Sequence, residues 1–86
     1  MTSGEIRDHV LQALRVVAPE VEPSSLRPDV PFRDQIDIDS MDALRFAIEL
    51  HRRVGVDIPE KDYRLLATLD AAAAYLSARL QAGTAR

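Results

Sequence analysis

The chain has 86 residues, no cysteine and a formal net charge of −3. A chain of this length has room for one small hydrophobic core, so we expect a single free-standing domain over residues 1–86. The lack of cysteine excludes disulfide scaffolds, cysteine-based zinc sites and a thiol nucleophile supplied by the chain. The acidic balance argues against a nucleic-acid module, and the longest apolar run is too short for a membrane span. We therefore expect a cytoplasmic monomer with neither nucleic acid nor membrane as a partner.

The spacing of apolar residues is helical on both sides of a proline-rich segment, residues 19–31. Thr2 and Glu5 form the pattern of a capping box that opens the first helix. Gly55 suits the left-handed position that ends the second helix. The predicted fold class is all-α, a four-helix bundle with three main helices and a short third one. The helices are predicted at about residues 3–17, 40–54, 59–65 and 68–81.

Two further caps and one long connection complete the predicted bundle. Asp57, with Glu60 three residues on, predicts a capped start for the third helix, and Thr68 predicts the cap of the fourth. The loop from Ala18 to Asp39 is long for a compact domain. We expect its proline-rich part to be non-helical and its apolar side chains to pack across the bundle. These side chains are Val21, Leu26, Val30, Phe32, Ile36 and Ile38.

The start of the second helix, residues 35–42, admits several interpretations. In the simplest interpretation, Asp39 or Ser40 is just the helix cap and accepts hydrogen bonds from the first N–H groups of the helix. A calcium loop fits poorly, because Met41 and Asp42 stand where an oxygen ligand and a glycine are required, and no metal site is predicted. A serine hydrolase also fits poorly because nothing resembles a nucleophile elbow. We predict no catalytic residue.

Several landmarks together indicate a family. Asp39-Ser40-Met41 at a helix start, Phe32 upstream, Gly55-Val-Asp-Ile-Pro59 downstream and Thr68 after it have a spacing that resembles acyl carrier proteins over nearly the whole chain. The resemblance implies that Ser40 carries 4′-phosphopantetheine, transferred from coenzyme A by a phosphopantetheinyl transferase that contacts Asp39. Acyl groups would be held on this arm as thioesters for fatty-acid, polyketide or specialised lipid enzymes. The chain itself would be no enzyme.

Apolar residues cover more of the second helix than one core contact requires. Either this helix is buried on two sides, or Met41, Leu44 and Ile48 form an exposed strip beside Ser40. We expect an exposed strip to dock the acyl-loading and biosynthetic enzymes. The predicted contacts with the transferase or other partners are Asp39, Met41, Asp42, Leu44, Arg45 and Ile48.

The charge of the second helix departs from the family pattern, because fatty-acid carriers typically present an acidic helix there. Between residues 39 and 53 acidic and basic side chains balance, and Arg45 would repel a partner with a basic patch. We therefore predict a specialised carrier, in secondary metabolism or a dedicated lipid pathway. Pairs at helical spacing are expected between Glu49 and each of Arg45, Arg52 and Arg53.

A pocket between the second and third helices could shelter the acyl chain, although the same residues are needed for an ordinary core. Its predicted lining is Leu44, Ala47, Ile48, Ile58, Tyr63 and Leu66. Two other functions stay open. A peptidyl or aminoacyl carrier shares the Asp-Ser landmark, and an unmodified helical adaptor would use Ser40 only as a cap.

Overall fold

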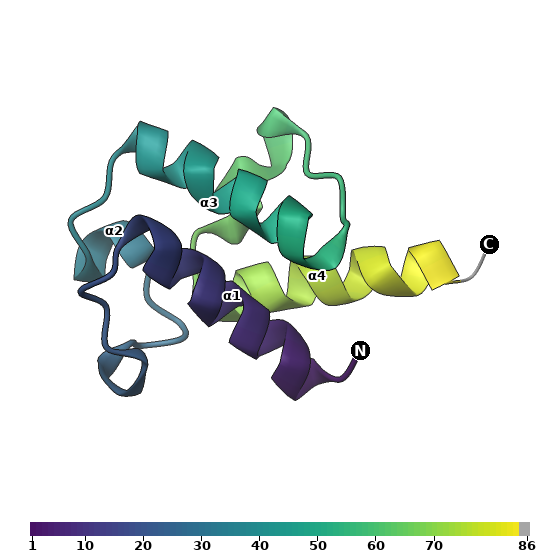
Figure 1. Cartoon of the computed structure of the whole chain (residues 1–86), viewed down its shortest axis with the longest axis horizontal. Helices are drawn as coiled ribbons and strands as arrows, with labels where there is room; N and C mark the ends of the chain where they lie inside the picture. Colours follow the sequence, from purple (N-terminus) through teal and green to yellow (C-terminus); the bar gives the residue numbers. More distant parts are fainter. Residues whose placement is uncertain (85–86) are drawn as a thin grey trace.

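Three long helices pack around one core. The computed structural model describes residues 1–84, and every regular element within them is helical. Helix α1 packs against α3 and α4, while η2 bridges α3 and α4 (Figure 1). The elements, with η for a 3₁₀ helix, are α1 (Ser3–Val17), η1 (Pro23–Ser25), α2 (Phe32–Gln35), α3 (Ser40–Val54), η2 (Glu60–Leu66) and α4 (Leu69–Thr84).

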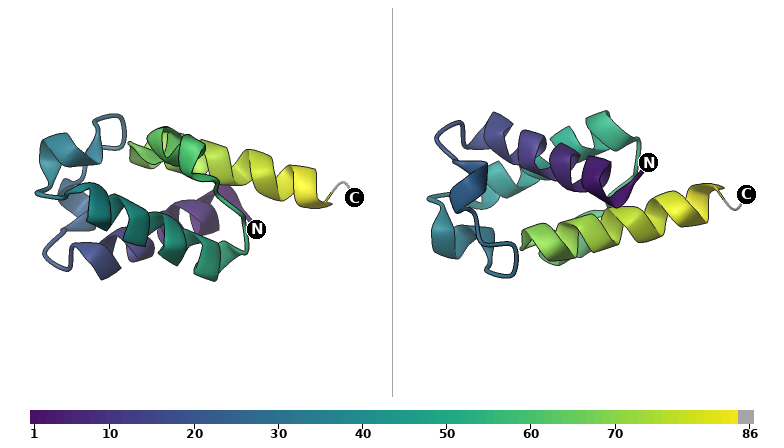
Figure 2. Two further views of the ribbon diagram at one scale, coloured as in Figure 1. Left: turned by 90° about the horizontal axis from the view of Figure 1, so that it is seen from above. Right: turned by 90° about the horizontal axis from the view of Figure 1, so that it is seen from below.

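The all-α prediction is confirmed, with the last two residues of the predicted domain outside the described residues. The start of α1 and the end of α4 lie at one end of the bundle, and the long loop lies at the other (Figure 2). Helix α4 ends at Thr84 and not at about residue 81. No helix in the described part of the chain combines the length and apolarity needed to span a bilayer.

The ends of α1 and α3 follow the signals in the sequence. The Glu5 amide donates to Thr2 Oγ1 at 3.1 Å, and the Thr2 amide donates to Glu5 Oε1 at 2.9 Å. This is the predicted capping box. Gly55 has φ of 73°, and its amide donates to the His51 carbonyl. A left-handed residue at this position ends α3 as predicted.

Gly55→Ala should destabilise the protein by about 1 kcal/mol, because alanine is strained at positive φ. Nothing lies within 4 Å of the added Cβ, so the cost is backbone strain alone. Gly4→Ala is the matched control. It lies inside α1 with only Thr2 Oγ1 near, at 3.9 Å, and should stabilise by about 0.5 kcal/mol. Urea unfolding measures both changes in the free energy of unfolding. A Gly55→Ala variant as stable as the unsubstituted protein would contradict this account.

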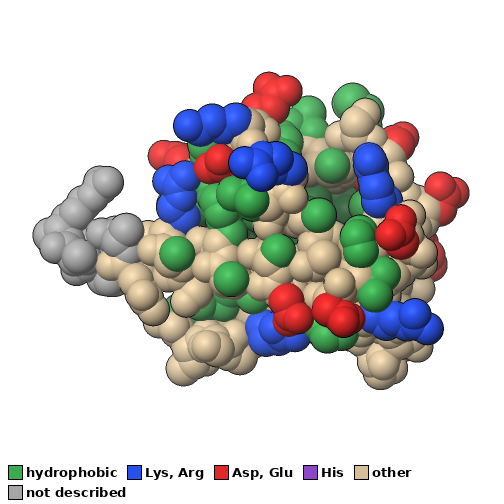
Figure 3. All heavy atoms as spheres, turned by 180° about the vertical axis from the view of Figure 1, so that it is seen from behind, with side chains coloured by type: hydrophobic (Ala, Val, Ile, Leu, Met, Phe, Trp, Pro, Cys, Tyr) green, Lys and Arg blue, Asp and Glu red, His purple; other side chains and the backbone are tan. Residues whose placement is uncertain are grey.

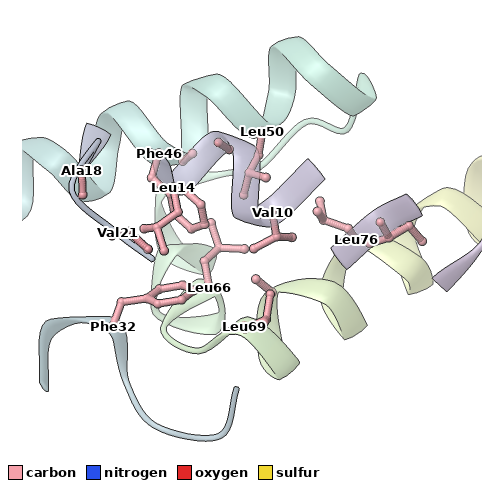
Figure 4. Close-up of a cluster of buried hydrophobic side chains, with 14 of the residues drawn as sticks. Val10, Leu14, Ala18, Val21, Phe32, Phe46, Leu50, Leu66, Leu69 and Leu76 are labelled. Carbon is pink, nitrogen blue, oxygen red and sulfur yellow. The ribbon is translucent and has the colours of Figure 1, made fainter. Parts of the chain in front are cut away.

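The core is built from one face of each long helix together with the loop (Figure 4). Leu14, Leu50 and Leu76, from α1, α3 and α4, are fully buried. Phe32 from α2 meets Phe46 from α3 edge to face, with ring centroids 5.6 Å apart, a favoured aromatic geometry. The core therefore fixes α3 against the loop that leads into it.

The long loop packs across the bundle as predicted and contains more helix than predicted. Val21 and Phe32 are buried, and Leu26, Ile36 and Ile38 are partly buried against the core. The prediction of a non-helical loop is wrong for η1, and it missed α2. Proline is compatible with the start of both short helices, because the first backbone N–H groups of a helix have no acceptor within it and one of them can be absent. Pro23 is the first residue of η1, and Pro31 directly precedes α2.

Backbone and side-chain hydrogen bonds hold this loop in place. The Phe32 amide donates to the Ala67 carbonyl at 2.8 Å, and the Asp70 amide donates to the Pro28 carbonyl at 3.0 Å. The Gln35 side chain bonds to the backbone of Arg27 and Val30. The segment before α3 is therefore tied to the junction between η2 and α4.

The third helix differs from the prediction. It is a 3₁₀ helix over residues 60–66, with Pro59 at the cap position and no side-chain cap. The predicted Asp57 cap is wrong, and its carboxylate lies instead 3.4 Å from His51 Nδ1. Pro59 is extended, with ψ of 150°, so the helix begins beyond the reach of Asp57. The Thr68 cap is confirmed, since Thr68 Oγ1 accepts from the Ala71 amide at 2.9 Å.

The carboxylate of Asp62 links η2 to α4. The Tyr75 hydroxyl donates to Asp62 Oδ2 at 2.7 Å, and Arg79 Nη2 donates to the same oxygen at 2.9 Å. The Arg79 guanidinium also lies 5.1 Å from the centre of the Tyr75 ring, within cation–π range. The hydrogen bond from Tyr75, helped by Arg79, holds the pKa of Asp62 below its usual value of 3.8.

A lowered pKa makes this cluster sensitive to acid. A carboxylate with a lowered folded pKa stabilises the fold above its unfolded pKa, and that contribution is lost as the pH falls through the folded value. Asp62→Asn should therefore be less stable than the unsubstituted protein at pH 7, and the difference should shrink as the pH falls below about 4 and through the lowered pKa of Asp62. Urea unfolding across this range measures the difference, with Asp8→Asn, at an exposed position of α1, as control. An equal loss at all pH values would contradict the prediction.

Candidate functional site

Ser40 is the first residue of α3 and is exposed at the loop end of the bundle. Asp39, not Ser40, caps the helix: Asp39 Oδ1 accepts from the Asp42 amide at 2.9 Å, and Asp42 Oδ2 accepts from the Asp39 amide at 3.3 Å. The Ser40 hydroxyl has no hydrogen-bond partner among the described residues. Ser40 is therefore available for reaction and is not used as a cap.

The backbone around Ser40 suits a negatively charged group. The first amides of a helix have no acceptor within it, and here the Asp39 side chain and carbonyl accept from Asp42 and Ala43. The Ser40 and Met41 amides remain, at the positive end of the α3 dipole. A phosphate at a helix N-terminus is stabilised by such amides and by the dipole. The position thus fits a phosphodiester on the Ser40 oxygen.

The apolar strip beside Ser40 is exposed, which decides between the two interpretations of α3. Met41 is 62% exposed, Ile48 is 56% exposed and Leu44 is 37% exposed. The opposite side of the same helix buries Phe46, Ala47 and Leu50 in the core. Helix α3 is therefore apolar on a buried face and on an exposed face.

The charges of α3 pair with one another, with one difference from prediction. Glu49 accepts hydrogen bonds from Arg52 and Arg53, and the hydrogen bond from Arg52 lowers the pKa of Glu49. The predicted pair between Glu49 and Arg45 does not form, because Arg45 turns to Asp42, with Nη1 3.5 Å from Oδ1. Charged side chains of both signs also alternate with hydrophobic ones on the face in Figure 3.

Two hollows lie along the seam between α3 and η2. The near hollow, of about 640 Å³, opens beside Ser40. The far hollow, of about 500 Å³, lies toward the C-terminal end of α3. The near hollow is lined by residues that include Phe32, Arg33, Ile38, Ser40, Ala43, Leu44, Phe46, Glu60, Tyr63, Arg64, Leu66 and Ala67. The far hollow is lined by Ala47, Ile48, His51, Asp57, Ile58, Pro59, Tyr63 and Arg79.

The predicted pocket residues are divided between these hollows. Leu44 and Leu66 line the near hollow, Ala47, Ile48 and Ile58 line the far one, and Tyr63 lines both. The prediction missed the wall formed by Phe32 and Ile38, because it considered only the second and third helices. Their apolar character in the long loop was the available signal.

The other predicted site residues lie together at the start of α3. Asp39, Met41, Asp42 and Arg45 occupy the cap and first turns around Ser40, and Leu44 and Ile48 continue the exposed strip along the helix. Within the described residues no three histidine, aspartate or glutamate side chains gather as metal ligands do.

Comparison with known proteins adds a family match. A family model described as a phosphopantetheine attachment site matches residues 5–76. An acyl carrier protein of Chlorobium luteolum is 32% identical over 76 residues, covering 88% of this chain and 96% of that protein. The meromycolate extension acyl carrier protein of Mycobacterium tuberculosis is 36% identical over 56 residues, covering 65% of this chain. That match spans 49% of the mycobacterial protein, so the chain corresponds to about half its length.

A solved structure gives the same fold. The acyl carrier protein of Enterococcus faecalis superposes with a TM-score of 0.72 and covers 92% of this chain and 99% of its own. Its sequence is 21% identical to this one, so the likeness concerns the arrangement of the helices.

Proposed function

Because this chain belongs to the acyl carrier protein family, whose members carry covalent 4′-phosphopantetheine, we propose that it holds acyl groups as thioesters on such an arm attached to Ser40. The observation that carries the proposal is the exposed Ser40 hydroxyl at the first position of α3, beside a hollow of about 640 Å³. The domain is a carrier and catalyses nothing. Its cytoplasmic location and monomeric state stay predictions of the sequence.

Attachment requires little from the chain itself. The Ser40 oxygen forms a bond to the phosphorus next to the pantetheine of coenzyme A, the bond from that phosphorus to the bridging oxygen breaks, and adenosine 3′,5′-bisphosphate leaves. The transferase takes the serine proton, while the Ser40 and Met41 amides of α3 face the new negative charge. The arm supplies the thiol that a chain without cysteine lacks. Asp39 beside Ser40 is the proposed transferase contact.

The near hollow is the proposed shelter for the acyl chain. It opens at Ser40, and its walls include the apolar side chains of Ile38, Leu44, Phe46 and Leu66. Each methylene that leaves water in such a hollow gains about 0.8 kcal/mol. This position revises the predicted pocket toward the N-terminal end of α3, because the loop before α3 supplies one wall.

The exposed strip of Met41, Leu44 and Ile48 is the proposed docking surface for acyl-loading and biosynthetic enzymes. Exposed apolar residues beside a reactive group allow an enzyme to hold the carrier while it acts on the arm. Asp42 and Arg45 flank the strip as an ion pair, so the electrostatic contribution is mixed. We propose a specialised pathway on this basis, supported by similarity to carriers named for meromycolate extension.

Arg45 allows the specialised role to be tested. Its side chain is 57% exposed, and a positive charge there opposes a basic partner. Enzymes of housekeeping fatty-acid synthesis should use this carrier poorly, and Arg45→Glu should raise their kcat/KM by about tenfold at low salt. Arg45→Gln, which removes the charge without reversing it, should give a smaller gain. Turnover of the unsubstituted carrier equal to that of the enzymes' own carrier would sink the specialised role.

Acylation tests the carrier function itself. Incubation with acyl-coenzyme A and a broad-specificity transferase should add one acyl-phosphopantetheinyl group, seen as an intact-mass increase. Hydroxylamine should then remove the acyl group alone, as expected for a thioester. A folded sample that gains no mass would instead support an unmodified helical adaptor. Loading by aminoacyl-adenylating enzymes in preference to acyl-loading ones would support a peptidyl or aminoacyl carrier.

A further inference from the structure

Tyr63 is the residue shared by the two hollows beside α3. The near hollow begins at Ser40, and the far hollow ends at His51 and Arg79. Tyr63, on η2, lines both. Its aromatic ring is therefore in position to separate a space next to the attachment point from a second space further along the same helix.

The position of the Tyr63 ring is set by η2 and not by its own hydroxyl. That hydroxyl forms no hydrogen bond with any residue in the described part of the chain. Helix η2 is fixed on either side of Tyr63, since Asp62 bonds to Tyr75 and Arg79, and Leu66 is buried in the core. The half-buried side chain of Tyr63 thus borders both hollows from a helix that is held on either side of it.

The two spaces have similarly mixed linings. The near hollow combines apolar side chains such as Ile38 and Leu66 with the charged Arg64, and the far hollow combines Ile58 with Arg79. A saturated chain gains by burying methylenes in either space. A limit on its length therefore comes from the side chain that borders both spaces and not from a change in polarity.

We propose that Tyr63 determines the length of acyl chain that this carrier shelters, by closing the near hollow against the far one. The inference rests on the proposed carrier function and deepens it. Chains short enough to fit the near hollow are fully sheltered, and the additional methylenes of longer chains remain outside. Removal of the ring joins the two spaces and extends the sheltered length.

The experiment loads the full-length protein with butanoyl, octanoyl, dodecanoyl and hexadecanoyl groups from their coenzyme A thioesters. Cleavage by hydroxylamine proceeds from the exposed form, so each additional sheltered methylene should slow it about fourfold until the hollow is full. In Tyr63→Ala the slowing should continue to longer chains, so that its hexadecanoyl form is cleaved at least tenfold more slowly than the unsubstituted one. Nuclear magnetic resonance shifts at Ile58 should then appear only in the variant.

Matched variants separate the ring from general effects on η2. Tyr63→Phe keeps the ring and should reproduce the unsubstituted profile, because the hydroxyl has no partner among the described residues. Leu65→Ala truncates a residue on the same helix that lines neither hollow and should do the same. If Tyr63→Ala fails to fold, Tyr63→Leu removes the ring while keeping an apolar side chain, and the same shift to longer chains is expected.

If the cleavage rate of folded, loaded Tyr63→Ala or Tyr63→Leu depends on acyl-chain length as it does in the unsubstituted protein, the inference is overturned and the carrier function stays intact. The same holds if a hexadecanoyl chain on the unsubstituted protein shifts Ile58 as strongly as Ile38. Failure to load any acyl group would overturn the carrier function and this inference with it.

Discussion

Ser40→Ala should take up no phosphopantetheinyl group, whereas the unsubstituted protein takes up one. The Ser40 oxygen is the atom that forms the new bond, so its loss leaves the transferase without an acceptor and the effect is complete. The fold should be unaffected, because Asp39 provides the cap and alanine is a good helix former. Intact-mass measurement after incubation with coenzyme A and a transferase gives the result directly.

Two controls make the result specific to the hydroxyl. Ser24→Ala removes another exposed serine, in η1, and should load normally. Asp39→Ala removes the cap and should cost about 1 kcal/mol of stability, which Ser40→Ala should not. Loading of Ser40→Ala at the unsubstituted rate would exclude Ser40 as the attachment point. A large loss of stability in Ser40→Ala would mean that its hydroxyl has a structural role after all.

Leu50→Ala should lower the free energy of unfolding by about 2–5 kcal/mol. Leu50 is fully buried on the core face of α3, and truncation of such a side chain loses its transfer free energy and leaves a cavity. A domain of this length has a total stability of roughly 4–13 kcal/mol, so the variant approaches unfolding. Urea denaturation followed by circular dichroism measures the change.

Ile48→Ala is the matched control on the same helix. Ile48 is 56% exposed on the strip beside Ser40, so its truncation should change stability by less than about 0.5 kcal/mol. Equal losses at the two positions would mean that the strip is part of the core and not a docking surface. A small loss for Leu50→Ala would contradict the packing of α3 described here.

The parts of the fold that were predictable from sequence depend on local signals. The Thr2 and Glu5 capping box, the left-handed Gly55 and the Thr68 cap each act within a few residues, and each forms as predicted. Asp57 failed although its spacing to Glu60 was right, because Pro59 keeps the chain extended and moves the helix start. A cap pattern allows a helix to start, and the intervening backbone decides whether that start is used.

The position of Ser40 in the site was predictable from the sequence, but the walls of the hollow beside it were not. Ser40 at the first turn of α3 followed from its neighbours, whereas one wall of the near hollow is formed by Phe32 and Ile38 from the loop. The hydrogen bond from the Phe32 amide to the Ala67 carbonyl joins residues far apart in sequence, and no local pattern indicates it. Arg45 likewise has two acidic residues within helical reach, and only the three-dimensional structure shows that it pairs with Asp42.

The most direct test of the central claim is the position of the added group in the loaded protein. Trypsin releases the segment from Asp34 to Arg45, in which Ser40 is the only hydroxyl-bearing residue. After incubation with coenzyme A and a transferase, mass spectrometry of this peptide should show the whole phosphopantetheinyl mass on it, with fragment ions placing it at Ser40. The mass increment on a peptide containing Ser24 or Ser25, or on none, would contradict the account.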